Sequence, residues 1–113
     1  AGAGHDTVEN YYGSHVTIQA GSGNDSITNY WGDKILMAGD SGNDYISNGN
    51  STVVSSGGRS VTMTGGEGDD RLINFGSNVT MTGGDGSDYL YTENGDNVKM
   101  FGGAGNDSIY NKE

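Results

Sequence analysis

The stretch Gly102-Gly103-Ala104-Gly105-Asn106-Asp107-Ser108-Ile109 is the clearest copy of a pattern that recurs along this chain. In every copy a glycine is followed two residues later by aspartate, and two residues after that by Val, Ile or Leu. The copies are spaced by 18 or 19 residues, except for one step of 26 residues between the third and fourth. Such a period indicates a stacked repeat. The repeated aspartates are Asp6, Asp25, Asp44, Asp70, Asp88 and Asp107.

The composition of the chain, with high net charge and few hydrophobic residues, offers little apolar surface to stabilise a fold. The 113 residues carry a net charge of -10, and only 31% of them are hydrophobic. These values alone would place the chain among disordered sequences. The 22 glycines recur in a regular register, however, which a random linker would not show. Because the chain has no cysteine to form disulfides or thiolate metal sites, we expect a repeat fold stabilised by bound cations.

Charge and hydropathy exclude several partners. Only five Lys and Arg residues are available to meet phosphates, so we expect no nucleic acid and no anionic membrane surface as partner. No apolar run approaches the roughly 20 residues of a membrane span, and no signal peptide is visible. Because the chain starts inside a repeat and stops shortly after one, we expect a piece of a longer protein whose open ends are able to stack on other copies.

Each repeat divides into two half-turns. A Gly-x-Gly-x-Asp turn leads into a short strand, and a polar turn, here called the second turn, leads into a strand in which apolar and polar residues alternate. The alternating strands are expected at residues 16–19, 35–38, 61–64, 79–82 and 98–101, with their first and third residues inward. The short strands supply one inward apolar residue each: Val8, Ile27, Ile46, Leu72, Leu90 and Ile109.

Two short strands and two turns in 18–19 residues describe one coil of an all-β parallel β-roll, or narrow β-solenoid. We expect about five to six coils in a single domain over residues 1–113. The long step between Asp44 and Asp70 predicts a loop insertion near residues 48–56, on the side of the second turn. The alternative is an additional short strand with Val53 and Ser55 inward.

A second column of residues lies four positions after the repeated aspartates. Asn bonds its own turn readily, and identical Asn side chains stacked one coil apart bond one another along the axis. We therefore predict a structural role for this column, here called the Asn column: Asn10, Asn29, Asn48, Asn74, Thr92 and Asn111.

The Gly-x-Gly-x-Asp turn has the chemistry of a cation site. Its glycines permit positive φ and bring carbonyl oxygens together, and its aspartate adds a hard oxygen ligand. Stacked turns would place carbonyl oxygens and two carboxylates around each gap between coils. Ca²⁺ takes six to eight oxygens in a flexible cage, whereas Mg²⁺ retains its waters, so Ca²⁺ fits better. The repeats predict one row of up to about five Ca²⁺.

The six motifs resemble the Gly-Gly-x-Gly-x-Asp-x-apolar-x nonapeptide of RTX (repeats-in-toxin) proteins over essentially the whole chain. The resemblance implies secretion by bacteria and folding on contact with extracellular calcium. It implies calcium ligation by the six repeated aspartates and by main-chain carbonyls of their turns, which include Gly4, Gly23, Gly42, Gly68, Gly86 and Gly105.

The second turns depart from the pattern of typical RTX proteins, which repeat the nonapeptide on both sides of the roll. They read Asn74-Phe75-Gly76-Ser77-Asn78 or Glu93-Asn94-Gly95-Asp96-Asn97 and lack the motif, so a single calcium row is expected. Such one-sided rolls are similar to the repeats of some large bacterial adhesins. We therefore predict a calcium-binding structural module of a secreted or cell-surface bacterial protein, an adhesin or exoprotein, with no enzymatic activity.

A surface that binds carbohydrate, ice or another protein is the alternative function. Aromatic residues cluster in the second turns, as Tyr11, Tyr12, Tyr30, Trp31 and Phe75. They would either grip a sugar face or a partner protein, or form an aromatic ladder that stiffens the turns. An outward threonine row includes Thr17, Thr62 and Thr80, but other residue types interrupt it. His5 and His15 are isolated, so solvent exposure is expected for them rather than zinc binding.

Overall fold

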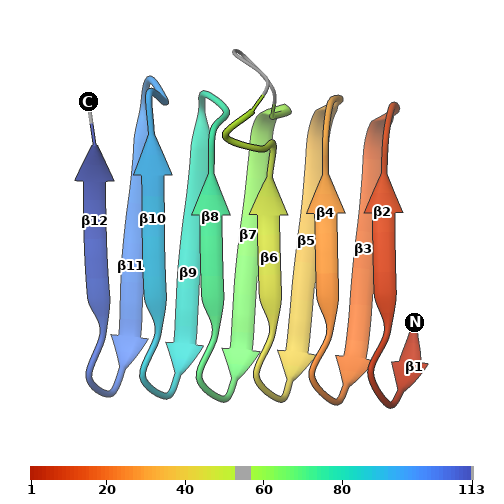
Figure 1. Cartoon of the computed structure of the whole chain (residues 1–113), viewed down its shortest axis with the longest axis vertical. Coiled ribbons are helices and arrows are strands. Elements are labelled where there is room, and N and C mark those ends of the chain that lie inside the picture. The colour runs from red at the N-terminus through yellow and green to blue at the C-terminus, as the bar shows by residue number, and fades with distance from the viewer. Residues whose placement is uncertain (53–56, 113) are drawn as a thin grey trace.

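The structure is a computed structural model that describes residues 1–52 and 57–112. Its described residues form two parallel sheets of six strands that face each other (Figure 1). One sheet has the order β1-β3-β5-β7-β9-β11, with β1 at Gly2–Ala3, β3 at Ser14–Ser22, β5 at Asp33–Ser41, β7 at Arg59–Glu67, β9 at Val79–Asp85 and β11 at Val98–Ala104. The other has the order β12-β10-β8-β6-β4-β2, with β2 at Thr7–Asn10, β4 at Ser26–Asn29, β6 at Tyr45–Asn48, β8 at Arg71–Asn74, β10 at Tyr89–Glu93 and β12 at Ser108–Lys112.

The chain alternates between the two sheets, so each coil adds one strand to each. Every strand pairs in parallel with its counterpart one repeat along, and equivalent residues lie side by side. Ile18, for example, pairs with Met37, and Met63 pairs with Met81. The predicted all-β parallel β-solenoid is therefore confirmed, with about six turns.

The core lies between the two sheets and consists of the predicted inward residues. Ile27, Ile46, Leu72 and Leu90 are completely buried on one sheet, opposite the Val, Ile and Met residues of the other. Burial decreases toward the terminal coils, where Val8 and Val98 are partly buried and Ile109 is 46% exposed. Only about three apolar side chains per coil point inward, which makes the core thin and leaves an important role for polar columns.

The longer strands extend beyond their predicted bounds. The strand expected at residues 16–19 runs from Ser14 to Ser22, and its counterparts extend similarly. The parallel ladder continues into the first residues of the Gly-x-Gly-x-Asp turn, where Gly66 pairs with Gly84. The turn itself is therefore held in register by the sheet, which positions successive motifs above one another.

The long repeat leaves the register of the Gly-x-Gly-x-Asp turns unchanged. Strand β6 pairs with β8, Tyr45 beside Arg71 and Asn48 beside Asn74. The longer connection runs from the end of β6 at Asn48 to the start of β7 at Arg59, and its described residues, 49–52 and 57–58, lie on the side of the second turns (Figure 1). The alternative strand with Val53 and Ser55 inward lies outside the described residues. Among the described residues no helix is present that would span a membrane.

Candidate metal centre

The repeated aspartates form a column inside one edge of the solenoid, here called the Asp column. Each follows a turn at the end of a long strand, at the lower edge in Figure 1. Asp25, Asp44, Asp70 and Asp88 are only 2–3% exposed, and the terminal members Asp6 and Asp107 are half-buried. The stacking thus brings the predicted aspartates together as neighbours and removes their carboxylates from water.

One carboxylate oxygen of every aspartate after Asp6 has a main-chain partner. Oδ1 of Asp44 accepts the amide N–H of Asp25 at 2.8 Å, and Oδ1 of Asp70 accepts the N–H of Asp44 at 2.8 Å. The same bond joins Asp6 to Asp25, Asp70 to Asp88 and Asp88 to Asp107, at 2.7–3.0 Å. These bonds orient the carboxylates along the solenoid axis.

The other carboxylate oxygen, Oδ2, is buried without any hydrogen-bond partner in Asp6, Asp25, Asp44, Asp70 and Asp88. In Asp44, Asp70 and Asp88 it lies against the first glycine of the same motif, and a Cβ added to Gly65, for example, would collide with Oδ2 of Asp70. That added Cβ would also lie 2.6 Å from the carbonyl oxygen of Gly83 on the next coil. The absence of a side chain thus leaves a small space between oxygens of adjacent coils.

The third glycines of the motifs stack on one another almost without space. Gly42, Gly68 and Gly86 have φ values of +124°, +122° and +139°, in the region that L side chains rarely adopt. A Cβ on Gly68 would collide with the carbonyl oxygen of Gly42 on the preceding coil. Glycine is required here both for its backbone conformation and for the close approach of main-chain oxygens.

Those carbonyl oxygens are not used by the hydrogen-bond ladder. In the four inner turns, the two amides after the third glycine bond side-chain oxygens or nitrogens of neighbouring coils instead, as Asn43 N–H does with Asn24 Oδ1 at 2.9 Å. Among the described turns no hydrogen bond ends on the carbonyl oxygens of the third glycines. They are therefore available as ligands: Gly4, Gly23, Gly42, Gly68, Gly86 and Gly105.

The residue just before each repeated aspartate is a feature that sequence reasoning missed. Asn24, Asn43 and Asp69 each accept an amide N–H from the next coil, at 2.8–3.0 Å. His5 is exposed, as expected, but its Nδ1 accepts the N–H of Asn24 at 3.1 Å. The recurrence of small polar residues at this position was the available signal, and it indicates a second, outer column of turn caps.

The electrostatics of the Asp column disfavour free carboxylate charges. Burial raises the pKa of Asp70 to about 7, and nearby carboxylates including Asp44 and Asp88 add to the effect. Burial also raises the pKa of Asp44 and of Asp88. The hydrogen bonds from main-chain amides lower these values only in part. The carboxylates are thus arranged to accept a proton or a cation.

The donors available around the column are carboxylate and carbonyl oxygens alone. Among residues 1–52 and 57–112, nowhere do three or more His, Cys, Asp or Glu side chains form a metal-binding group. A cation between two coils would consequently need main-chain carbonyls as well as two aspartates. A hard cation with flexible coordination, such as Ca²⁺, fits this donor set better than Zn²⁺ or Mg²⁺.

The opposite edge carries the predicted Asn column instead of a second motif. Asn10 donates to Asn29, Asn29 to Asn48, and Asn48 to Asn74 through side-chain amides, at 2.7–2.9 Å. Asn74 continues the column by donating to Oγ1 of Thr92 at 3.0 Å. The expected structural role is therefore confirmed from Asn10 to Thr92, where the column and nearby main-chain groups satisfy the buried amides, whereas Asn111 is exposed.

The aromatic residues in the second turns of the first and second coils stack in pairs. The ring centroids of Tyr11 and Tyr30 are 4.8 Å apart, and those of Tyr12 and Trp31 are 5.4 Å apart. Phe75 is separate from them and meets Tyr91 edge to face at 6.5 Å. This arrangement is the aromatic ladder that the sequence analysis offered as one alternative.

The outward threonine row is interrupted as the sequence indicates. In the register of the long strands, Leu36 lies between Thr17 and Thr62, and Lys99 follows Thr80. Leu36 is 42% exposed, so the row presents a mixed surface and no regular hydroxyl array.

These observations define a parallel β-solenoid with an oxygen-lined column for cations along one edge. The model of the RTX calcium-binding nonapeptide repeat matches the chain in four copies, at residues 15–33, 47–73, 76–98 and 99–110. The matched ranges cover more than half of the 113 residues, and the chain belongs to this family. Its repeats bind Ca²⁺ and form a structural module. Neither the curated proteins nor the solved structures that were compared gave a match.

Proposed function

We propose that this chain is a folding and spacer module of a secreted bacterial protein, in which a single row of Ca²⁺ along the Asp column holds the coils together. The observation that carries the proposal is the run of buried Oδ2 atoms without partners, repeated in successive coils. The proposed ligands are the six aspartates of the Asp column and the carbonyl oxygens of the third glycines. Six stacked turns have five gaps between them, hence up to about five ions.

Calcium would supply positive charge at the place where the fold has concentrated buried negative charge. The formal net charge of the chain is -10, and about five Ca²⁺ would neutralise a similar amount. Neighbouring carboxylates repel one another without the ions. Because the ordered site does not exist in the unfolded chain, the free energy of metal binding becomes free energy of folding.

This coupling supports an extracellular role. RTX repeats are typical of secreted bacterial proteins, and a chain that needs calcium to fold would fold only where calcium is abundant. A repeat whose coils contact only their neighbours makes an extended spacer. Adhesins and exoproteins use such modules to carry other domains, and we place this chain in one of these two classes.

Far-UV circular dichroism and isothermal titration calorimetry test the proposal. We expect a β spectrum in millimolar Ca²⁺, a largely unordered spectrum in chelator, and no recovery with the same concentration of Mg²⁺. Asp70→Asn should reduce calcium affinity at least about tenfold, since it removes a charged ligand while preserving its shape. Asp96→Asn is the matched control, because Asp96 is an exposed acid of a second turn.

A β spectrum that chelator leaves unchanged at neutral pH would contradict calcium-coupled folding. Equal losses of affinity in Asp70→Asn and Asp96→Asn would instead contradict the assignment of the ligands, since only the general charge of the chain would then matter.

A further inference from the structure

The outer face of the sheet formed by the even-numbered strands is aromatic from β6 to β12, where Tyr110 on β12 lies beside Tyr91 and its ring packs against Tyr89. On β4 the outward residues are Ser26 and Thr28, whereas on β6 to β10 they include Tyr45, Tyr89 and Tyr91. The register places these side chains in rows, with Tyr45 beside Arg71 and Arg71 beside Tyr89. This aromatic surface begins at β6, the strand that precedes the insertion.

A groove with a volume of about 310 Å³ lies over these rows. Its floor includes Ser47, Ile73 and Tyr91, and the segment Gly49-Asn50-Ser51 of the insertion contributes one wall. Ser47 and Ile73 belong to the outer face, yet they are only 4% and 7% exposed. The hydroxyl of Ser47 donates to the carbonyl oxygen of Gly49 at 2.8 Å, which ties the wall to the sheet. The volume is in the range of small-molecule sites.

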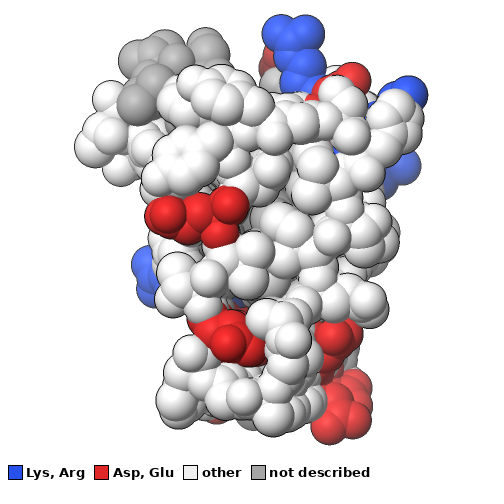
Figure 2. Space-filling model, turned by 90° about the vertical axis from the view of Figure 1, so that its right-hand side faces the viewer, with Lys and Arg blue, Asp and Glu red and all other residues white. Residues whose placement is uncertain are grey.

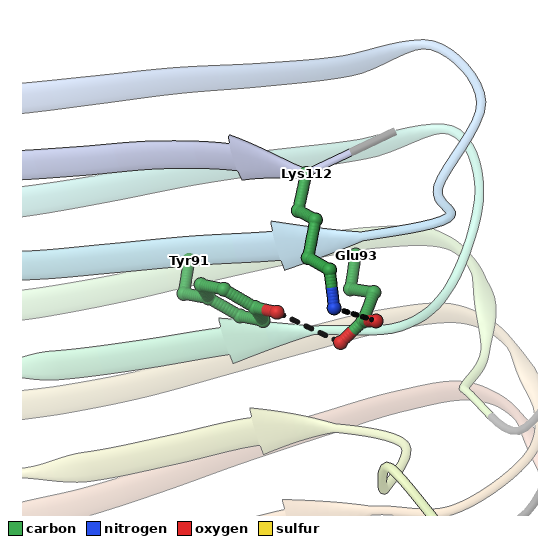
Figure 3. Close-up of polar contacts among 3 residues, drawn as sticks. All are labelled: Tyr91, Glu93 and Lys112. Carbon is green, nitrogen blue, oxygen red and sulfur yellow. Dashed lines mark hydrogen bonds and ion pairs between the residues drawn. The ribbon is translucent and has the colours of Figure 1, made fainter.

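The polar groups at the end of the groove are held in place by one another. The hydroxyl of Tyr91 donates to Glu93 Oε2 at 2.7 Å, and Lys112 Nζ donates to Glu93 Oε1 at 2.6 Å (Figure 3). These contacts hold the pKa of Glu93 below its ordinary value, with the Lys112 bond as the larger cause. A charged carboxylate with fixed orientation thus lies at the lip of an aromatic surface.

The aromatic side chains that line the groove are also held in place by contacts with neighbouring side chains. The guanidinium of Arg71 lies over the ring of Tyr89, 4.5 Å from its centroid, and Phe75 packs edge to face against Tyr91. The face of Tyr89 is therefore used by Arg71, while Tyr45 on the opposite side of Arg71 remains 40% exposed. The exposed ring offers an apolar plane next to the hydrogen-bond donors of Arg71, whereas the oxygens of Glu93 lie toward the other end of the groove, four residues along β10 from Tyr89.

This combination matches one class of ligand. A pyranose ring has an apolar C–H face that packs on an aromatic plane, and hydroxyl groups around its edge that need both donors and acceptors. Polyanions such as nucleic acids are disfavoured, because the chain carries a net charge of -10 and a carboxylate lies at the groove. A wholly apolar ligand would leave the charged groups at the rim without hydrogen-bond partners.

We propose that the groove between Gly49–Ser51 and the outer face of β6, β8 and β10 binds adjacent pyranose units of a neutral glycan. Tyr45 provides the stacking plane for one unit and Arg71 donates hydrogen bonds to its hydroxyls, while Glu93, toward the other end of the groove, accepts hydrogen bonds from the next unit. This function goes beyond calcium binding, although it requires the folded solenoid.

The test uses the calcium-loaded chain and four neutral tetrasaccharides, built from α-linked glucose, β-linked glucose, mannose or N-acetylglucosamine. Amide NMR spectra of ¹⁵N-labelled protein should shift at Ser47, Ile73 and Tyr91 on addition of at least one probe at millimolar concentration. Tyr45→Ala should then weaken the binding about tenfold or more, since an exposed aromatic plane dominates such contacts. Glu93→Gln is the second variant, which retains shape and should weaken binding several-fold.

Tyr12→Ala is the matched control, because Tyr12 is 76% exposed and belongs to the aromatic ladder of the second turns. It should change the affinity less than twofold. Circular dichroism in calcium establishes that each variant is folded. The proposal is overturned if no probe shifts the groove amides at 10 mM, or if shifts instead map to Tyr12 and Trp31. A uronic-acid tetrasaccharide that binds more tightly than every neutral probe would overturn the choice of a neutral sugar.

Discussion

At the scale of single residues, each position of the repeated motif has its own physical reason. The first glycine leaves space beside an Asp Oδ2, whereas the third adopts positive φ and contacts the coil before it. The first two copies depart from this pattern, because Ala1 and the fully buried Ala20 stand where later copies have glycine. Asp40 replaces the second glycine and adopts a φ of 79°, which Asp tolerates better than most residues.

Gly68→Ala tests the requirement for glycine at the third position. A Cβ there combines left-handed backbone strain of roughly 1–3 kcal/mol with a collision against the main chain of Gly42. We expect urea unfolding in saturating calcium to show a loss of at least about 2 kcal/mol. Gly2→Ala is the control, because an added Cβ at Gly2 meets nothing within 4 Å. Equal and small losses in both variants would show that the stacked glycines tolerate side chains.

At the scale of elements, the strands are aligned by two polar columns as well as by the core. The Asp column holds one edge through amide-to-carboxylate bonds, and the Asn column holds the other through side-chain amides. Both columns bridge every step of the solenoid that they span, including the long one between the third and fourth copies of the motif. The pairing of β6 with β8 therefore keeps its register despite the longer connection between β6 and β7.

Asn48→Ala tests the contribution of the Asn column. Asn48 is fully buried, donates to Asn74 and Gly58, and accepts from Asn29 and from the amide of Gly58. Its removal leaves several buried groups without partners, at about 1–3 kcal/mol each before relaxation. We expect a net loss of about 3 kcal/mol in the free energy of unfolding, measured by urea denaturation with calcium present.

Asn106→Ala is the control for this loss, because Asn106 is exposed in the last Gly-x-Gly-x-Asp turn. It should change the free energy of unfolding by less than about 0.5 kcal/mol. If Asn48→Ala caused no greater loss than Asn106→Ala, the core and main-chain ladder would be aligning the strands unaided.

At the scale of the whole molecule, compactness and charge oppose each other. The radius of gyration is 12.4 Å, although the chain carries a net charge of -10. Figure 2, which views the stack from its N-terminal coil, shows acidic side chains at the lower end, where the Asp column lies. Like charges gathered in this way destabilise the compact state unless cations or protons bind. The folded state should consequently depend on both calcium and pH.

Small-angle scattering measures the calcium dependence directly. With calcium, the radius of gyration should remain near the compact value, whereas chelator at pH 7.5 should raise it toward the roughly 34 Å of an unfolded chain of this length. Compact scattering in chelator at that pH would contradict the prediction.

In chelator, stability should decrease as the pH rises. The pKa of Asp70 is about 7 in the folded chain, whereas the ordinary pKa of an aspartate, expected in the unfolded chain, is 3.8. Between about pH 4 and 7 the unfolded chain therefore releases this proton while the folded chain keeps it, so rising pH favours unfolding. Circular dichroism in chelator should show more β structure at pH 5 than at pH 7.5. In saturating calcium the trend should reverse, because calcium binds deprotonated carboxylates.

The period, the inward positions and both polar columns could be predicted from the amino-acid sequence alone. A regular repeat makes each residue stack on its counterpart, so one copy of the motif defines the neighbours in all the others. Ile46 and Leu72, for example, were identified as inward residues from their place after the aspartate, and both are fully buried.

Only the tertiary structure decided how the oxygens of the Asp column are divided and where the groove lies. One carboxylate oxygen accepts the amide N–H of the preceding coil and the other is buried without a hydrogen-bond partner, which depends on the offset between coils. The capping role of Asn24 and Asn43 has the same origin. The groove depends on the path of Gly49-Asn50-Ser51 over Ile73, and that path follows from contacts between residues far apart in the sequence. Repetition determines contacts within the stack, whereas an insertion that breaks the period must be placed by packing.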